Sequence, residues 1–166
     1  MSSIDLKKIR AETPGCEEVL HFNNAGASLP PQAVYQAVTD HLKLESRMGG
    51  YEAGAHAQEK LQRFYQAFAA LLNCDPGEIA FVENATRAWD MVFYAIPFKS
   101  GDRILTARAE YASNYLAFLQ VARQKNIIID VVPNDASGQI SLDALEKMID
   151  EDVKLIAITH VPTHGG

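Results

Sequence analysis

Asn84, Ala85 and Thr86 form the stretch of this chain whose residue types and order best suit the binding of an anion. They follow an apolar run, residues 79–82, that predicts a short buried strand, and they open a segment, residues 85–95, whose apolar spacing predicts a helix. The Asn84 side chain can cap that helix. Because the first turn of a helix has free backbone N–H groups and the positive end of the helix dipole, we expect Ala85 and Thr86 to bind a phosphate. A capped helix with no ligand is the alternative.

Tyr111 and Thr163 could complete a site for a planar ring. Tyr111 follows the predicted strand at residues 103–107, and its ring could lie flat against a heterocycle. A half-exposed loop aromatic is the alternative for this residue. Thr163 follows the predicted strand at residues 154–159, where its hydroxyl could reach a ring substituent. A phosphate site beside an aromatic platform predicts a phosphorylated aromatic cofactor.

The elements that must position these residues alternate between strand and helix. Apolar runs predict strands at residues 103–107, 127–132 and 154–159, and helical spacing predicts helices at residues 114–124 and 141–148. This alternation predicts an α/β fold with a mainly parallel sheet and helices on both faces. In such sheets the ligand lies beyond the carboxyl ends of the strands, which is where the candidate residues stand.

An N-terminal helical segment is expected ahead of the sheet. Helical stripes begin after Pro31 and again near His56, and the first is closed by Gly49 and Gly50. Before them, residues 23–28 are small, polar and turn-forming, so their backbone can lie close to a ligand. A surface loop is the alternative for this stretch.

Charge and composition exclude several classes of partner. The net charge of −6 and the absence of a basic cluster argue against nucleic acid or an anionic membrane. No apolar run approaches the length of a membrane span. Cys16 and Cys74 are far apart in the sequence, which predicts free thiols in the cytoplasm. His160 and His164 have a spacing seen in metal sites, but they lack a convincing third ligand, so no metal site is predicted.

Four motifs resemble those of the class V aminotransferase group, in the same order and at similar spacing. They are Phe22-Asn23-Asn24-Ala25-Gly26, Glu83-Asn84-Ala85-Thr86, Glu110-Tyr111-Ala112-Ser113-Asn114 and Ile158-Thr159-His160-Val161-Pro162-Thr163-His164-Gly165-Gly166. That group has fold type I and depends on pyridoxal 5′-phosphate (PLP). It includes cysteine desulfurases, selenocysteine lyases, isopenicillin N epimerase-like proteins and C–S lyases. The resemblance implies a homodimeric enzyme that acts on an amino acid or a sulfur-containing derivative of one.

The resemblance also implies a role for each matching residue. Ala85 and Thr86 match the phosphate-binding turn, and Tyr111 matches the residue that stacks on the pyridine ring. Thr163 matches the position that approaches the ring hydroxyl. The loop that closes over the substrate is matched by Asn24, Ala25 and Gly26. Many desulfurases carry His where Tyr111 stands and Asn where Thr163 stands, so the C–S lyase and epimerase-like branches resemble this chain more.

Two groups that the family needs are expected beyond Gly166: the Schiff-base lysine and the acid that faces the pyridine nitrogen. No lysine of this chain carries the family's lysine motif, so no catalytic residue is predicted in it. We expect residues 1–50 to be an N-terminal segment and helix, and residues 51–166 to be the first part of the PLP-binding large domain, without activity on their own. A non-catalytic module that binds another phosphorylated ligand, or that works by assembly, is the alternative.

Overall fold

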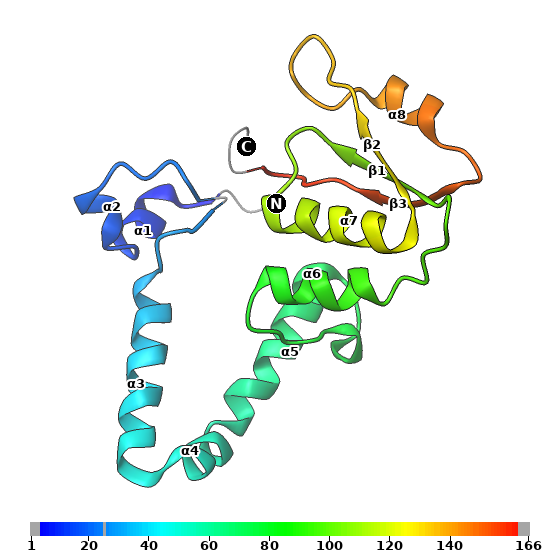
Figure 1. The fold of residues 1–166 in the computed structure, drawn as a ribbon. Helices are drawn as coiled ribbons and strands as arrows, with labels where there is room; N and C mark the ends of the chain where they lie inside the picture. Colours follow the sequence, from blue (N-terminus) through cyan, green and yellow to red (C-terminus); the bar gives the residue numbers. More distant parts are fainter. Residues whose placement is uncertain (1–3, 25, 163–166) are drawn as a thin grey trace. The chain divides into compact units, whose positions relative to one another are not determined.

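Three parallel strands form the sheet of this protein in the computed structural model, which describes residues 4–24 and 26–162 (Figure 1). The strands are β1 (Arg103–Ala107), β2 (Ile128–Val132) and β3 (Val153–Ala157), in the order β2-β1-β3. β1 pairs with both neighbours, and its three central residues are buried. Each of these strands lies within two residues of its predicted position.

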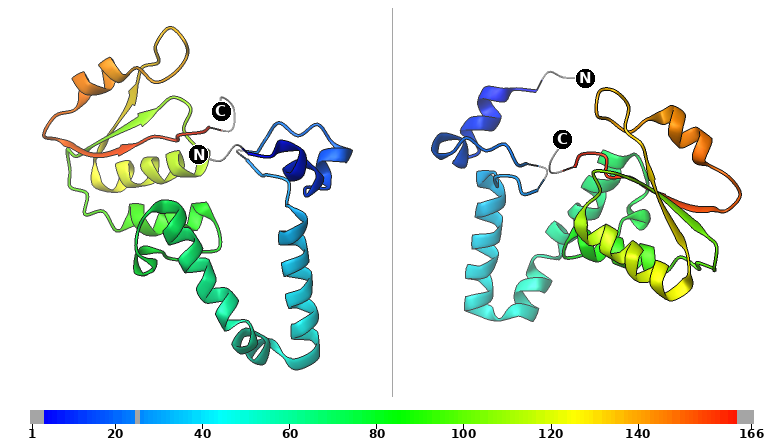
Figure 2. Two further views of the ribbon diagram at one scale, coloured as in Figure 1. Left: turned by 180° about the vertical axis from the view of Figure 1, so that it is seen from behind. Right: turned by 45° about the horizontal axis from the view of Figure 1, so that its top comes forward.

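Helices cover both faces of this sheet, as predicted. Helix α7 (Ala112–Lys125) connects β1 to β2, and α8 (Leu142–Met148) connects β2 to β3. The two connections run in opposite directions across the sheet, so right-handed crossovers place α7 and α8 on opposite faces. Figures 1 and 2 show this arrangement. The predicted α/β class with a mainly parallel sheet is therefore confirmed.

An aromatic cluster joins α6 (Ala85–Tyr94) to the outer side of α7. Phe118 of α7 is completely buried, and its ring centroid lies 5.4 Å from that of Phe93 and 5.9 Å from that of Trp89. Ile104 of β1 belongs to the same core. Since large aromatic side chains contribute most to burial, this cluster fixes α6 against α7.

The predicted strand at residues 79–82 is wrong. These residues follow a short 3-10 helix, η1 (Pro76–Glu78), and Ile79 has extended backbone angles (φ −99°, ψ 128°). A strand also needs hydrogen bonds to a neighbour, and within residues 4–24 and 26–162 the sheet contains β1, β2 and β3 alone. Ile79 is thus extended, but the run 79–82 pairs with no strand among the residues that the structure describes.

The first of two compact units, residues 1–81, is helical, and the sheet belongs to the second, residues 82–166. The helices of the first unit are α1 (Leu6–Ala11), α2 (Gly15–Glu18), α3 (Gln32–Met48), α4 (Gly50–His56) and α5 (Gln58–Leu72). Helix α3 follows Pro31 and ends at Gly49, whose φ of 90° suits glycine. The N-terminal helical segment is thus confirmed, and the predicted domain boundary at residue 50 stays a prediction. Among the described residues no helix is both long and apolar enough to span a membrane.

Arg103 fixes the amino end of the sheet. Its Nε and Nη2 atoms lie 2.8 Å from Asp130 Oδ2, and its Nη1 contacts the Asp150 carboxylate. The pKa of Arg103 is raised above its ordinary value, first by the hydrogen bond to Asp130. This network ties β1 to β2 and to the segment that enters β3. It lies at the amino ends of the strands, opposite to the candidate site.

Candidate functional site

The N-terminus of α6 has the geometry expected of an anion site. Asn84 Oδ1 accepts a hydrogen bond from the Arg87 backbone N–H at 2.9 Å, so the predicted cap is confirmed. The backbone N–H groups of Ala85 and Thr86 make no hydrogen bond within the part of the chain that the structure describes. These two donors, at the positive end of the helix dipole, remain available to a ligand.

A second helix begins beside the first. The Thr86 hydroxyl lies 3.4 Å from the hydroxyl of Ser113, which belongs to the first turn of α7. Ser113 comes two residues after Tyr111 in the chain. The structure therefore brings the predicted phosphate turn next to the segment that carries the predicted ring platform. Two helix N-termini close together also strengthen the local attraction for an anion.

Tyr111 stands at the start of α7 with its side chain half exposed, at 53% of full exposure. Its backbone is held on both sides: the carbonyl accepts from the Tyr115 N–H at 3.1 Å, and the N–H donates to Glu110 Oε1 at 2.7 Å. A ring that is open to solvent above a fixed backbone can cover one face of a planar ligand. Both readings of this residue from sequence, platform and loop aromatic, agree with its exposure.

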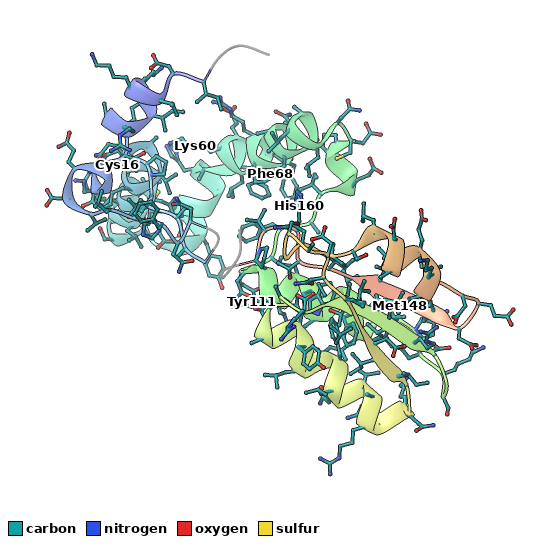
Figure 3. The ribbon with its side chains drawn as sticks, turned by 90° about the horizontal axis from the view of Figure 1, so that it is seen from above. Cys16, Lys60, Phe68, Tyr111, Met148 and His160 are labelled. Atoms are coloured by element: carbon teal, nitrogen blue, oxygen red, sulfur yellow. The ribbon has the colours of Figure 1, made fainter. Side chains whose placement is uncertain are left out.

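The loop after β3 lies at the same end of the sheet, beyond the carboxyl ends of the strands. Figure 3 shows Tyr111 and His160 toward one end of the sheet and Met148 toward the other. Thr159, two residues beyond the end of β3, donates a hydrogen bond to the Glu110 carboxylate. Thr163, the predicted contact to the ring hydroxyl, lies outside the described residues, as does His164. Within the described ranges no three metal-ligating side chains gather in one place.

Glu110 is a site residue whose role sequence reasoning missed. Its carboxylate accepts hydrogen bonds from Thr106, Asn114 and Thr159 as well as from the Tyr111 N–H. The available signal was an acidic residue in the short loop between a strand and an uncapped helix start. Its partner Thr159 is 49 positions away in the sequence, so local patterns could not reveal the contact.

The predicted substrate loop belongs to the helical unit and is described there by itself. Asn23 closes a turn by accepting from the Gly26 N–H at 3.2 Å through its side-chain oxygen. A Cβ atom added at Gly26 would lie 2.7 Å from that side chain, so only glycine fits this turn without displacing Asn23. Asn24 belongs to the same turn, and Ala25 lies outside the described residues. The structure leaves the roles of Asn24, Ala25 and Gly26 as predictions.

A hollow of about 340 Å³ adjoins the Tyr111 segment, at the carboxyl ends of β1 and β2. It is lined by Ala107, Arg108, Glu110, Ala112, Tyr115 and Val131. The lysines of this unit stand elsewhere, after α6, at the ends of α7 and α8, or at the start of β3: Lys99, Lys125, Lys147 and Lys154. The arrangement therefore offers hydrogen-bond donors and an aromatic face, which suit binding more than proton transfer.

Most of the chain is similar to proteins of a known family. The family model for "Aminotransferase class-V" matches residues 19–166. A probable cysteine desulfurase from Pyrococcus abyssi is 28% identical over 92% of this chain and 39% of its own length. The chain thus spans about two-fifths of the length of this curated relative.

Solved structures share the fold. An apo cysteine desulfurase from Thermococcus onnurineus superposes with a TM-score of 0.80 and 27% identity, over 98% of this chain and 42% of that one. A C-DES variant with glycine covalently linked to its PLP cofactor has a TM-score of 0.81 and 24% identity, over 92% of this chain and 41% of that one. Because the family model covers nearly all of the sequence, this chain belongs to the class-V aminotransferase family.

Proposed function

We propose that this chain supplies the phosphate- and ring-binding elements of a PLP site in an enzyme that acts on an amino acid or a sulfur-containing derivative of one. The observation that carries the proposal is the contact between Thr86 and Ser113, since it joins the first turn of α6 to the first turn of α7, which Tyr111 precedes. Membership of the class-V aminotransferase family supports the choice of cofactor.

Each candidate residue has a role in this proposal. The backbone N–H groups of Ala85 and Thr86, together with the Thr86 hydroxyl, bind the phosphate. Tyr111 covers the pyridine ring and Thr163 faces the ring hydroxyl. Asn24, Ala25 and Gly26 contact the substrate. Residues 51–166 then form the first part of the cofactor domain. No catalytic residue is assigned to this chain.

When bound, PLP supplies an electron sink for bonds broken at the substrate Cα. The chain's own contribution is to bind the phosphate of that group and to exclude water from one face of its ring. The reaction itself is open between desulfurase, C–S lyase and epimerase chemistry. The Pyrococcus relative is named a probable cysteine desulfurase, whereas C-DES is named a cystine C–S lyase, and this chain resembles both.

A non-catalytic module that binds another phosphorylated ligand is the second candidate. It is favoured by the positions of the four lysines in the sheet-bearing unit, all remote from the Tyr111 end of α7. A nucleotide would then satisfy the same N–H groups. The two candidates differ in which ring they accept, so ligand selectivity separates them.

Equilibrium dialysis of the purified chain with pyridoxine 5′-phosphate tests the proposal. This compound has the ring and phosphate of PLP but an alcohol in place of the aldehyde, so surface lysines cannot form Schiff bases with it. We expect it to bind at least about tenfold more tightly than pyridoxine, through charge-assisted hydrogen bonds to the phosphate. Binding of ATP without binding of pyridoxine 5′-phosphate would favour the second candidate.

We also propose that the enzyme is a cytoplasmic homodimer. The resemblance to the family and the two thiols, Cys16 and Cys74, support this proposal. Sedimentation velocity of the protein over a range of concentrations checks the oligomeric state. A single monomeric species at every concentration would contradict it.

A further inference from the structure

The carboxylate of Glu110 is held by four donors. Its Oε2 atom accepts from the Thr106 hydroxyl at 3.3 Å, and its Oε1 atom accepts from the Tyr111 N–H at 2.7 Å and from Asn114 Nδ2 at 3.0 Å. The Thr159 hydroxyl also donates to Oε1. An ionised carboxylate has about four acceptor positions and no donor, so it can accept from all of these groups, three at Oε1 and one at Oε2.

The donors come from stretches that are distant in the sequence. Thr106 lies in β1 and is completely buried, so its hydroxyl needs a partner. Thr159 lies beyond the end of β3 and is 49 positions from Glu110. One side chain thus connects the central strand, the start of α7 and the loop after β3.

Glu110 also holds the start of helix α7. Tyr111 occupies the cap position of α7, but its side chain makes no capping hydrogen bond. The neighbouring Glu110 carboxylate accepts from both the Tyr111 N–H and the Asn114 side chain, and so ties the residue before α7 to its first turn. These contacts hold the backbone of Tyr111, and with it the Cα–Cβ bond that carries the ring, at the start of α7.

We infer that Glu110 is a positioning residue for the ring platform of the cofactor site. It holds Tyr111 beside the loop after β3 and makes no contact with the ligand itself. The inference rests on the proposed function, in which the Tyr111 ring covers the pyridine ring of the cofactor. Glu110 therefore acts on ring binding through Tyr111 and leaves the phosphate contacts of α6 unchanged.

The Glu110→Gln variant tests this role with little change of shape. Its neutral amide has one acceptor oxygen in place of two, so the four donors lose the charged acceptor that they share. We expect about tenfold weaker binding of pyridoxine 5′-phosphate, the effect of losing a hydrogen bond to a charged group. Glu146→Gln makes the same chemical change on the exposed face of α8 and should leave binding unchanged.

Two comparisons separate positioning from a general loss of stability. Glu110→Gln should weaken pyridoxine and pyridoxine 5′-phosphate by the same factor, because only ring binding changes. In a Tyr111→Leu background, Glu110→Gln should have no further effect on either ligand. Binding is followed well below the unfolding temperature by the fluorescence of Trp89, the single tryptophan, which lies one turn along α6 from Thr86.

Each outcome is decisive. If the unmodified chain binds pyridoxine 5′-phosphate and Glu110→Gln binds it equally well, the inference fails while the proposed function stands. If Glu110→Gln weakens binding by the same factor with and without the Tyr111 ring, its effect does not pass through Tyr111, and the inference also fails. If the unmodified chain does not bind the ligand at all, the proposed function fails, and the inference falls with it.

Discussion

The hydroxyls of Thr86 and Ser113 lie 3.4 Å apart, although the two residues are 27 positions apart in the sequence. This contact joins the first turns of α6 and α7 and so brings the predicted phosphate turn beside the Tyr111 segment. One small molecule with a phosphate and a ring can therefore meet both elements.

Replacing Thr86 by Val should weaken the phosphate contact without changing the shape of the side chain. We expect pyridoxine 5′-phosphate to bind about five- to tenfold more weakly, the effect of one lost hydrogen bond, while pyridoxine binds as before. Calorimetric titration with both ligands measures the two effects. Thr86→Ser keeps the hydroxyl and serves as the control. Equal weakening of both ligands would show that Thr86 does not contact the phosphate.

Asn84→Ala removes the cap of α6 and should lower the free energy of unfolding by about 1 kcal/mol. The reason is the loss of the 2.9 Å hydrogen bond between Asn84 Oδ1 and the Arg87 N–H. Urea denaturation measures the change. Asn84→Asp keeps an acceptor oxygen and should be much closer to the unmodified chain; a loss as large as that of Asn84→Ala would argue against the cap.

The aromatic cluster under the site should be the costliest place to create a cavity. Phe118→Ala should lower the free energy of unfolding by about 3–5 kcal/mol, since Phe118 is completely buried against Phe93 and Trp89. Phe118→Leu keeps most of the volume and should cost less than half as much. Thermal unfolding followed by circular dichroism compares them. Similar melting temperatures for Phe118→Ala and the unmodified chain would contradict the assigned core.

Asp135 gives a prediction about pH. The hydroxyl of Ser137 donates to Asp135 Oδ1 at 2.6 Å, and this hydrogen bond is the first cause that lowers the pKa of Asp135 below its ordinary value of 3.8. The carboxylate therefore stabilises its turn fully above pH 3.8, and this stabilisation is lost as the pH falls through the lower folded pKa. Titration by carboxyl-carbon NMR should give a midpoint below 3.8, and Ser137→Ala should raise it. A midpoint unaffected by Ser137→Ala would rule out this cause.

Local patterns predicted the regular elements well. Residues 103–107 form the strand that their apolar run predicted, and the cap at Asn84 starts α6 as expected. These features depend on neighbours in the sequence. The run at residues 79–82 failed as a strand because hydrophobicity reports a tendency to be buried, whereas strand pairing depends on a distant partner.

The site could be predicted only in part, because its residues meet through contacts between distant parts of the chain. The types of Thr86 and Tyr111 pointed to a phosphate and a ring, but their proximity depends on the contact of Thr86 with Ser113. The role of Glu110 could not be predicted because it depends on the contact with Thr159. The parallel pairing of β1 and β3 brings these two residues together. The chemistry of each side chain can be read from the sequence. The meeting of these side chains at the carboxyl ends of the strands depends on the topology of the sheet.

The central claim is that one ligand touches both Thr86 and Tyr111, and intermolecular NOE measurements on the chain with pyridoxine 5′-phosphate test it most directly. We predict contacts from the ligand's phosphate-bearing methylene to the Thr86 methyl group and from its single ring proton to the Tyr111 ring. Contacts to one of these residues without the other, or to neither while the ligand is bound, would contradict the claim.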